Sequence, residues 1–344
     1  MKYYDYMGMN KIPGEIGLEV ETEASKAYNF LPEIEKYWHV HQDGSLRTNG
    51  WEYTFAAPLD RDSKKYSDAM EAFDKQSQVT KFIESPYSSV HVHLNMLDKE
   101  VIQMVNFLVL YFIFEEPLTE YCGPNRYSNL FCLNTGRAEY VYKVAKDMVK
   151  AIDNLEGYSY IRNLNNGTLK YSGINLVPLR TFGSLEVRTH PGTWKVEEIN
   201  RWVDILLCLY RAADTFKDPV EIVNRLLGCK SRLDFMENIF GKFLKYLPTD
   251  NLQKKIEDGI WYATSIAGAA EWKNFGNKKT DKQAVKRKLT QVEHWIDEAA
   301  QLTPATFAPG TLTWATNTVG GAGTVTNTLT PATQWVSIHP TTDQ

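Results

Sequence analysis

Apolar and polar residues alternate in four segments of the chain, as they do in a β-strand that buries one face. In the first, GLEVETE at residues 17–23, three glutamates alternate with Leu18, Val20 and Thr22. The same period of two occurs in WEYTF (51–55), SVHVHLN (89–95) and SLEVRTH (184–190). We therefore expect helices to cover the apolar face of one sheet, while the polar side chains share its other face.

The rest of the pattern predicts how helices and strands are ordered. Strands are expected at 15–23, 36–41, 51–58, 85–95, 169–179 and 184–190, and helices at 62–83, 98–116, 137–155 and throughout 194–298. Asp-Gly and Asn-Gly turn signals in QDGSLRTNG (42–50) indicate short connections, which favour a mainly antiparallel sheet and the α+β class. A Rossmann or P-loop fold is not expected, because neither glycine motif is present.

The composition changes abruptly near the C-terminus. Residues 299–342 contain no Asp, Glu, Lys or Arg, and the sequence LTPAT occurs in them twice. Such a stretch cannot build a core by itself, so we expect a tail that either stays flexible or pairs with another chain. The predicted organisation is a first domain over 1–215, a helical region over 216–298 that completes or caps it, and an uncharged Thr/Ala/Gly-rich tail over 299–344.

Overall composition indicates a soluble cytoplasmic protein. The net charge of −4 and the pI near 6.0 give no reason to expect a nucleic-acid partner. The most apolar run, residues 101–114, is too short to cross a bilayer and predicts a buried helix, so no membrane association is expected. The four cysteines follow no zinc or redox spacing, which predicts reduced thiols: Cys122, Cys132, Cys208 and Cys229.

The polar face of the predicted sheet consists mainly of metal-ligand residue types. It would carry Glu19, Glu21, Glu52, His91, His93, Glu186 and Arg188. Clustered carboxylates destabilise one another unless their pKa values rise or a cation lies among them. Oxygen-rich sites with an occasional imidazole suit Mg²⁺ or Mn²⁺, whereas a zinc hydrolase would show HExxH or three histidines. The arginine on this face suits a phosphate or a developing anion beside the metal.

Six segments in this order resemble the amidoligase family over roughly residues 14–215: GLEVETE, QDGSL, WEYTFAAP, SSVHVHLN, KYSGINL and SLEVRTHPGT. Members of this family are ligases of bacteria, fungi and bacteriophages with a glutamine synthetase-like catalytic fold. The resemblance implies an antiparallel sheet that binds ATP and two or three Mg²⁺ ions. It also implies that a carboxylate and ATP give an acyl phosphate, which an amine attacks to form an amide or isopeptide bond.

The resemblance also implies a role for each matching residue. The metal ligands would be Glu19, Glu21, Glu52, His91 and Glu186. His93 would contact phosphate or substrate, Arg188 would stabilise the transferring phosphoryl group, and Asp43 would assist deprotonation of the amine. Phosphoryl transfer needs further charge neutralisation, for which Arg126 and Lys170 are the best additional candidates. Asn175 follows as a weaker candidate for the nucleotide site, and Glu23 is left out as a rim carboxylate.

Other functions stay open at the level of the sequence. A ligase fold could serve a non-enzymatic structural or assembly role, for instance in a phage particle, with the tail as interaction element. A phage-encoded protein would then lie in the host cytoplasm or in the virion. A metal-dependent hydrolase would use the same acidic face, but no base-and-nucleophile pair is evident. The acid and amine substrates, an ammonia-supplying partner and the oligomeric state are not indicated by any pattern.

Overall fold

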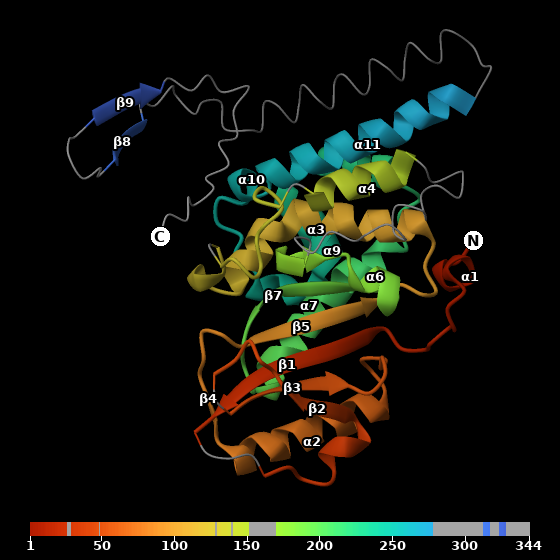
Figure 1. The fold of residues 1–344 in the computed structure, drawn as a ribbon. Helices are drawn as coiled ribbons and strands as arrows, with labels where there is room; N and C mark the ends of the chain where they lie inside the picture. Colours follow the sequence, from red (N-terminus) through yellow and green to blue (C-terminus); the bar gives the residue numbers. More distant parts are fainter. Residues whose placement is uncertain are drawn as a thin grey trace.

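The computed structural model describes most of the chain up to residue 277 and one hairpin of the tail (Figure 1). The described residues are 1–25, 29–47, 49–127, 129–138, 140–150, 170–277, 312–316 and 323–327. The predicted helical stretches 151–155 and 278–298 lie outside them. The predicted domain boundaries stay predictions.

A single antiparallel sheet forms the lower half of Figure 1. Its strands are β1 (Ile16–Ala24), β2 (Trp38–Gln42), β3 (Gly50–Phe55), β4 (Phe82–Ile83), β5 (Ser89–Asn95), β6 (Ile174–Asn175) and β7 (Ser184–Pro191). They follow the order β2-β3-β1-β5-β7-β6, with β4 paired to β1, and every pairing is antiparallel. The predicted α+β class with a mainly antiparallel sheet is confirmed.

Helices account for most of the remaining described residues. They are α1 (Tyr3–Met7), α2 (Lys64–Thr80), α3 (Val101–Tyr121), α4 (Tyr140–Lys150), α6 (Pro178–Thr181), α7 (Val196–Ala213), α8 (Pro219–Gly228), α9 (Arg232–Phe240), α10 (Leu252–Lys255) and α11 (Glu257–Asn277). Three 3₁₀ turns are η1 (Ile34–Lys36), η2 (Pro124–Arg126) and η4 (Gly241–Tyr246). The long strand expected at 169–179 is wrong: among its described residues only Ile174–Asn175 forms a strand, and Ser172 makes an isolated bridge to Leu133. Pro178 at the first helical position starts α6 and ends the extended segment.

The apolar face of the sheet packs against α2 and α7. Trp38 of β2 and Tyr53 of β3 contact Phe73 of α2, and the Trp38 indole donates to the carbonyl of Ala69 at 2.9 Å. Helix α7 packs against β5, α2 and α3. Buried residues of α8, α9 and α11 belong to the same hydrophobic core as these strands. The helical region up to residue 269 therefore shares one core with the sheet.

Helix α3 is the predicted buried helix. Its 21 residues are long and apolar enough to cross a membrane, but 83% of its most apolar window is buried inside the protein. Figure 1 shows it stacked with α4 and α11 above the sheet. The prediction of a core helix is thus confirmed.

Two strands are described within the tail. β8 (Leu312–Thr316) and β9 (Gly323–Asn327) pair antiparallel, with Trp314 opposite Val325. The described part of the tail thus forms one antiparallel hairpin.

Candidate metal centre

Strand pairing brings the predicted polar residues onto one patch of the sheet. In the register of β1 with its neighbours, Glu19 lies opposite His91 of β5, and Glu21 lies opposite Glu52 of β3. His93 in turn pairs with Glu186 of β7. Because directly paired residues point to the same face, carboxylates and imidazoles from four strands meet there. We call Glu19, Glu21, Glu52, His91, His93 and Glu186 the carboxylate–imidazole cluster.

Glu19 lies between the two histidines of the cluster. Its Oε2 is 3.1 Å from His91 Nδ1, and its Oε1 is 2.9 Å from His93 Nε2, off the line of a well-formed hydrogen bond. Burial alone would raise the pKa of Glu19, but the two histidines outweigh it and hold the pKa well below its usual range. Burial likewise opposes protonation of His93, yet its pairing with Glu19 raises the His93 pKa.

His91 is buried and lies between two further carboxylates of the cluster, Glu186 and Glu21. Its Nδ1 lies 3.3 Å from Glu186 Oε1, and its Nε2 lies 4.0 Å from Glu21 Oε1. Ser89 connects His91 to Glu21. Its hydroxyl is 2.7 Å from His91 Nε2 and donates to Glu21 Oε2 at 2.6 Å. Ser89 was not predicted from the sequence, although period two in SVHVHLN places it on the same face.

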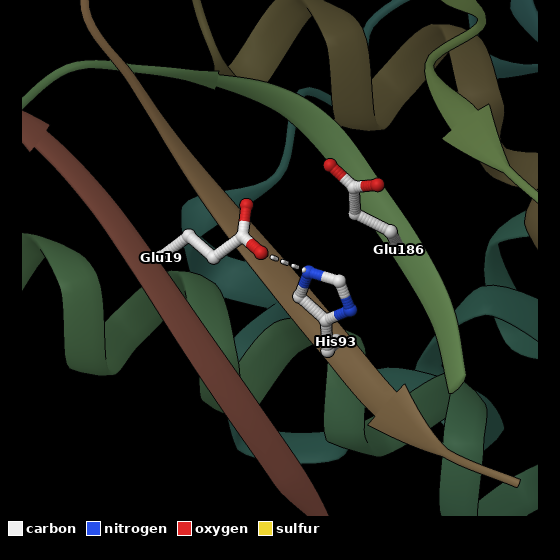
Figure 2. A group of neighbouring side chains, drawn as sticks. All are labelled: Glu19, His93 and Glu186. Atoms are coloured by element: carbon white, nitrogen blue, oxygen red, sulfur yellow. Dashed lines mark ion pairs between the residues drawn. The ribbon is translucent and has the colours of Figure 1, made fainter. Parts of the chain in front are cut away.

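Two groups of three side chains in the cluster can each offer ligand atoms to one ion. Figure 2 shows the first, in which Glu19, His93 and Glu186 come from three strands and converge. The second group is Glu19, Glu52 and His91, and in each group the three ligand atoms lie within 4.8 Å of one another. Carboxylate oxygens with one imidazole suit Mg²⁺ or Mn²⁺. His93 therefore has the geometry of a metal ligand as well as its predicted contact with phosphate.

Glu52 is bound by a histidine that sequence reasoning missed. His41 of β2 pairs with Glu52 in register, and its Nε2 forms a short contact with the Glu52 carboxylate. Burial, reinforced by repulsion from Glu19 and Glu21, raises the pKa of Glu52 to about 7, although His41 acts in the opposite direction. The missed signal was WHVHQ (38–42), which alternates apolar residues and histidines as residues 90–93 do.

Glu186 is held from two sides. Arg188 Nη1 donates to its Oε1, and Asn175 Nδ2 donates to its Oε2 at 2.6 Å. The structure thus places both predicted residues at the cluster. Asn175 acts there by positioning a carboxylate.

Asp43 and Lys170 make no described contact with the cluster carboxylates. Asp43 Oδ1 accepts the main-chain N–H of Ser45 at 2.7 Å and closes the turn after β2. Lys170 is exposed, with its ammonium 5.0 Å from the centre of the Tyr171 ring. Nothing among the described residues ties either side chain to the predicted chemistry.

A β-bulge in β7 explains where Arg126 goes. Val90 pairs with His190 and Val92 with Val187, so Arg188 and Thr189 together lie opposite a single residue of β5. The buried Arg126 guanidinium donates to both bulge carbonyls, from Nε to Thr189 O at 2.6 Å and from Nη2 to Arg188 O at 2.8 Å. Arg126 is thus bound to the main chain and contacts no cluster carboxylate among the described residues.

The same bulge corrects the predicted alternation of SLEVRTH. Strict period two in SLEVRTH would place His190 on the polar face beside Glu186 and Arg188. It is instead buried, 5.5 Å from Trp202 and 6.3 Å from Tyr121 between ring centres. An extra residue in one strand shifts every later side chain to the other face.

Glu23 is also buried, although it was expected to be a rim carboxylate. Arg47 donates to both of its oxygens, from Nε at 3.1 and 2.8 Å. These hydrogen bonds lower the pKa of Glu23. Its charge is thus compensated by Arg47, consistent with leaving it out of the metal-ligand set.

A cavity of about 560 Å³ lies against the cluster. Its lining includes the charged or titratable side chains Glu19, Glu52 and His93 and apolar side chains, among them Phe55 and Phe182. Phe182 is 66% exposed, with its ring 6.4 Å from that of His93. The cavity thus offers both polar and apolar contacts to one ligand.

No protein-family model matches the chain, and no curated protein matches it. The chemistry of the cluster therefore has to be argued from its own side chains.

Proposed function

We propose that the protein is an ATP- and Mg²⁺-dependent carboxylate–amine ligase of the amidoligase kind, with a glutamine synthetase-like catalytic sheet. The observation that carries this proposal is the convergence of four glutamates and two histidines from β1, β3, β5 and β7 on one sheet face, beside Arg188. A hydrolase has less support: the Ser89 hydroxyl does lie 2.7 Å from His91 Nε2, but it is buried, donates to Glu21 and does not line the cavity beside the cluster. Solvation alone is a poor account of these carboxylates, since Glu21 and Glu186 are buried.

The donor set fits Mg²⁺ or Mn²⁺. Five residues would hold the ions: Glu19, Glu21, Glu52, His91 and Glu186. Mg²⁺ bound there would neutralise the phosphate oxygens of ATP and favour transfer of the γ-phosphoryl group. The second cluster histidine, His93, is oriented by Ser184, whose hydroxyl lies 3.0 Å from Nδ1, so its Nε2 faces Glu19.

In the proposed reaction a carboxylate oxygen of the acid substrate bonds to the γ-phosphorus of ATP as the bond to ADP breaks. The amine nitrogen then bonds to the acyl carbon, phosphate leaves, and the amine gives up a proton. Arg188 would neutralise charge on the transferring group. Its guanidinium donates to Glu186, a proposed metal ligand, and therefore lies beside the expected metal site. Asp43 stays our candidate proton acceptor, although its one described side-chain contact is the hydrogen bond from Ser45.

The cavity beside the cluster supports a nucleotide ligand. Its lining combines Glu19 and His93, which suit phosphates carried by metal ions, with Phe55 and Phe182, aromatic rings of the kind on which a base packs. Its volume of about 560 Å³ lies within the range usual for ligand sites.

The decisive experiment is thermal stabilisation by ATP, with and without Mg²⁺. Ligand that binds only the native state raises stability according to its concentration and dissociation constant. We expect a Mg²⁺-dependent rise in Tm that Glu19→Ala abolishes and Glu237→Ala, at an exposed position on α9, retains. A folded protein that shows no such rise would contradict the proposal.

A structural or assembly role is a second candidate, favoured by one observation. The β8–β9 pair is an isolated two-stranded hairpin within the described part of the tail, and such hairpins are marginally stable alone. The uncharged tail would then gain stability by pairing with another protein. The two roles are compatible, because an active ligase could be carried by its tail.

A further inference from the structure

A second cavity, of about 490 Å³, lies where β5 begins and β7 ends. Ser88 and Gly192 form part of its wall, together with Trp194 and Arg126. It shares no lining residue with the cavity beside Glu19. It is therefore a separate binding volume, and the chemistry proposed above does not use it.

Arg126 is the unusual group in this cavity. The residue is only 6% exposed, and its guanidinium forms no ion pair with a carboxylate among the described residues. Arginine stays protonated in proteins, and a buried charge without a counter-ion is costly. Its Nη1 makes neither of the two bonds to the bulge carbonyls. The structure thus holds a fixed positive charge at the cavity wall with donor capacity to spare.

The other charged groups of the cavity are of both signs. Lys195 is exposed and pairs with Glu198 at 3.0 Å, and Glu84 lines the same cavity. These two carboxylates and two cations cancel in formal charge, so they offer no excess positive charge to a polyphosphate. They suit a small ligand that carries both a carboxylate and an ammonium group, with Trp194 as a flat apolar wall.

Chain connectivity joins this cavity to the cluster. Ser88 precedes Ser89, whose hydroxyl bonds Glu21 and His91. The carbonyl that accepts Arg126 Nη2 belongs to Arg188, whose own guanidinium bonds Glu186. Neighbouring residues of a strand are about 3.3 Å apart along its axis, so the cavity wall at Ser88 is one residue from Ser89, at the end of β5 where Ser89 bonds Glu21.

We propose that this cavity binds the acid substrate, an amino acid or the end of a peptide, with its carboxylate on Arg126. The proposal rests on the ligase function proposed above, to which it adds the substrate class. Arg126 would be a binding residue, fixed by the β7 bulge before the substrate arrives.

The test is calorimetric titration of the full chain without nucleotide or Mg²⁺. The probes are L-alanyl-L-alanine and L-alanine, each compared with the analogue whose carboxylate is replaced by an amide, L-alanyl-L-alaninamide and L-alaninamide. Asn125→Asp and Lys195→Glu add negative charge at exposed positions of the cavity wall and spare the bonds of Arg126 to the main chain. Arg126→Gln removes the guanidinium itself, and Lys230→Glu is the matched charge reversal at an exposed position outside the cavity.

We expect at least one carboxylate to bind, its amide analogue to bind at least about tenfold more weakly, and both wall variants to lose about tenfold in affinity. Lys230→Glu should leave the affinity unchanged. Binding of neither carboxylate, or binding that both wall variants retain, would overturn the proposal. Mg²⁺-dependent ATP binding without carboxylate binding would leave the ligase standing and remove this cavity from it. Carboxylate binding without ATP binding would support this cavity as a carboxylate site and contradict the ligase function.

Discussion

A carboxylate in the middle of a sheet is costly unless cations surround it, and Glu19 has two imidazoles within 3.1 Å. Its contacts show how a single residue can be tolerated by the fold and still be available to a ligand. The histidines compensate its charge in the absence of an ion, and the same nitrogens and oxygens are the atoms that a metal would use. Stability and function thus draw on the same side chains here.

Arg188→Ala should lower ATP turnover by at least about 100-fold, because charge neutralisation of the transferring phosphoryl group is lost. Arg188→Lys keeps the charge but not the planar guanidinium, so its ATP turnover should lie between those of the wild type and Arg188→Ala. Steady-state kinetics with circular dichroism to monitor folding would measure both. Arg180→Ala, on an exposed position of α6, is the control. Unchanged turnover in Arg188→Ala would contradict its role.

His190 should make the protein less stable in acid. Burial, with a further contribution from Arg126, lowers the pKa of His190 from 6.5 to about 4. The unfolded chain takes up this proton at the higher pH, so stability is lost as the pH falls from about 6.5 towards 4, by on the order of 3 kcal/mol. Urea unfolding of His190→Gln should show a flatter pH dependence over this window.

Glu115 provides a control with the opposite sign. Burial raises its pKa to about 7, although the main-chain N–H of Thr135 donates to its carboxylate at 3.0 and 2.9 Å. The folded protein keeps the Glu115 proton to a higher pH than the unfolded chain does. Glu115 therefore contributes to stability at low pH, and this contribution is lost as the pH rises from about 4.5 to 7. Glu115→Gln should therefore steepen the loss of stability in acid, and an equal change in both variants would rule out these assignments.

At the scale of elements, the local sequence pattern sets which side chains of a strand share a face, and strand pairing sets which of them meet. Period two defines the faces of β1, β3 and β5 from sequence, and the pairing of β1 between β3 and β5 brings their carboxylates and imidazoles together. Helix α3 shows the opposite case: its residues are buried nearly all round, so it has no amphipathic signal and depends on length and composition.

Ile113→Ala in α3 should lower the free energy of unfolding by about 2–5 kcal/mol, because Ile113 is fully buried and truncation leaves a cavity. Val79→Ala in α2 removes less apolar surface from a side chain that is 46% exposed. Its effect should stay within about 0.5 kcal/mol. Urea denaturation of the two variants measures both values, and equal losses would mean that α3 is not the centre of the core.

At the scale of the whole molecule, one core extends from Tyr3 to Ala269 and carries both cavities on the same sheet. Helices α8, α9 and α11 are part of this core, so residues up to 269 are needed for the fold that supports the cluster. The predicted region 216–298 therefore contributes to folding at least over its described, buried part.

Removing residues 300–344 should spare Mg²⁺-dependent stabilisation by ATP, because every cluster residue and the whole described core precede the cut. If the tail is an interaction element, the truncated chain should also lose assembly, which light scattering of both forms would measure. Loss of ATP binding on truncation would show that the catalytic unit extends into the tail.

The sequence by itself determined which residues share the polar face of the sheet. Side-chain direction in a strand is a local property of the backbone, so Glu19, Glu21, Glu52, His91 and Glu186 could be grouped without knowing any contact. The α+β class followed from periodicity and turn signals, and the buried helix, predicted at 98–116 and observed at Val101–Tyr121, followed from length and composition.

Only the tertiary structure decided which of these residues touch and where the cations go. Register places His41 on Glu52 and Ser89 between Glu21 and His91, and it depends on pairing between segments far apart in the chain. No pattern marks the bulge at Arg188 and Thr189, which turns His190 into the core. The same bulge frees the two carbonyls that bind Arg126. This contact could not be predicted, because its acceptors are main-chain groups, which carry no sequence signal.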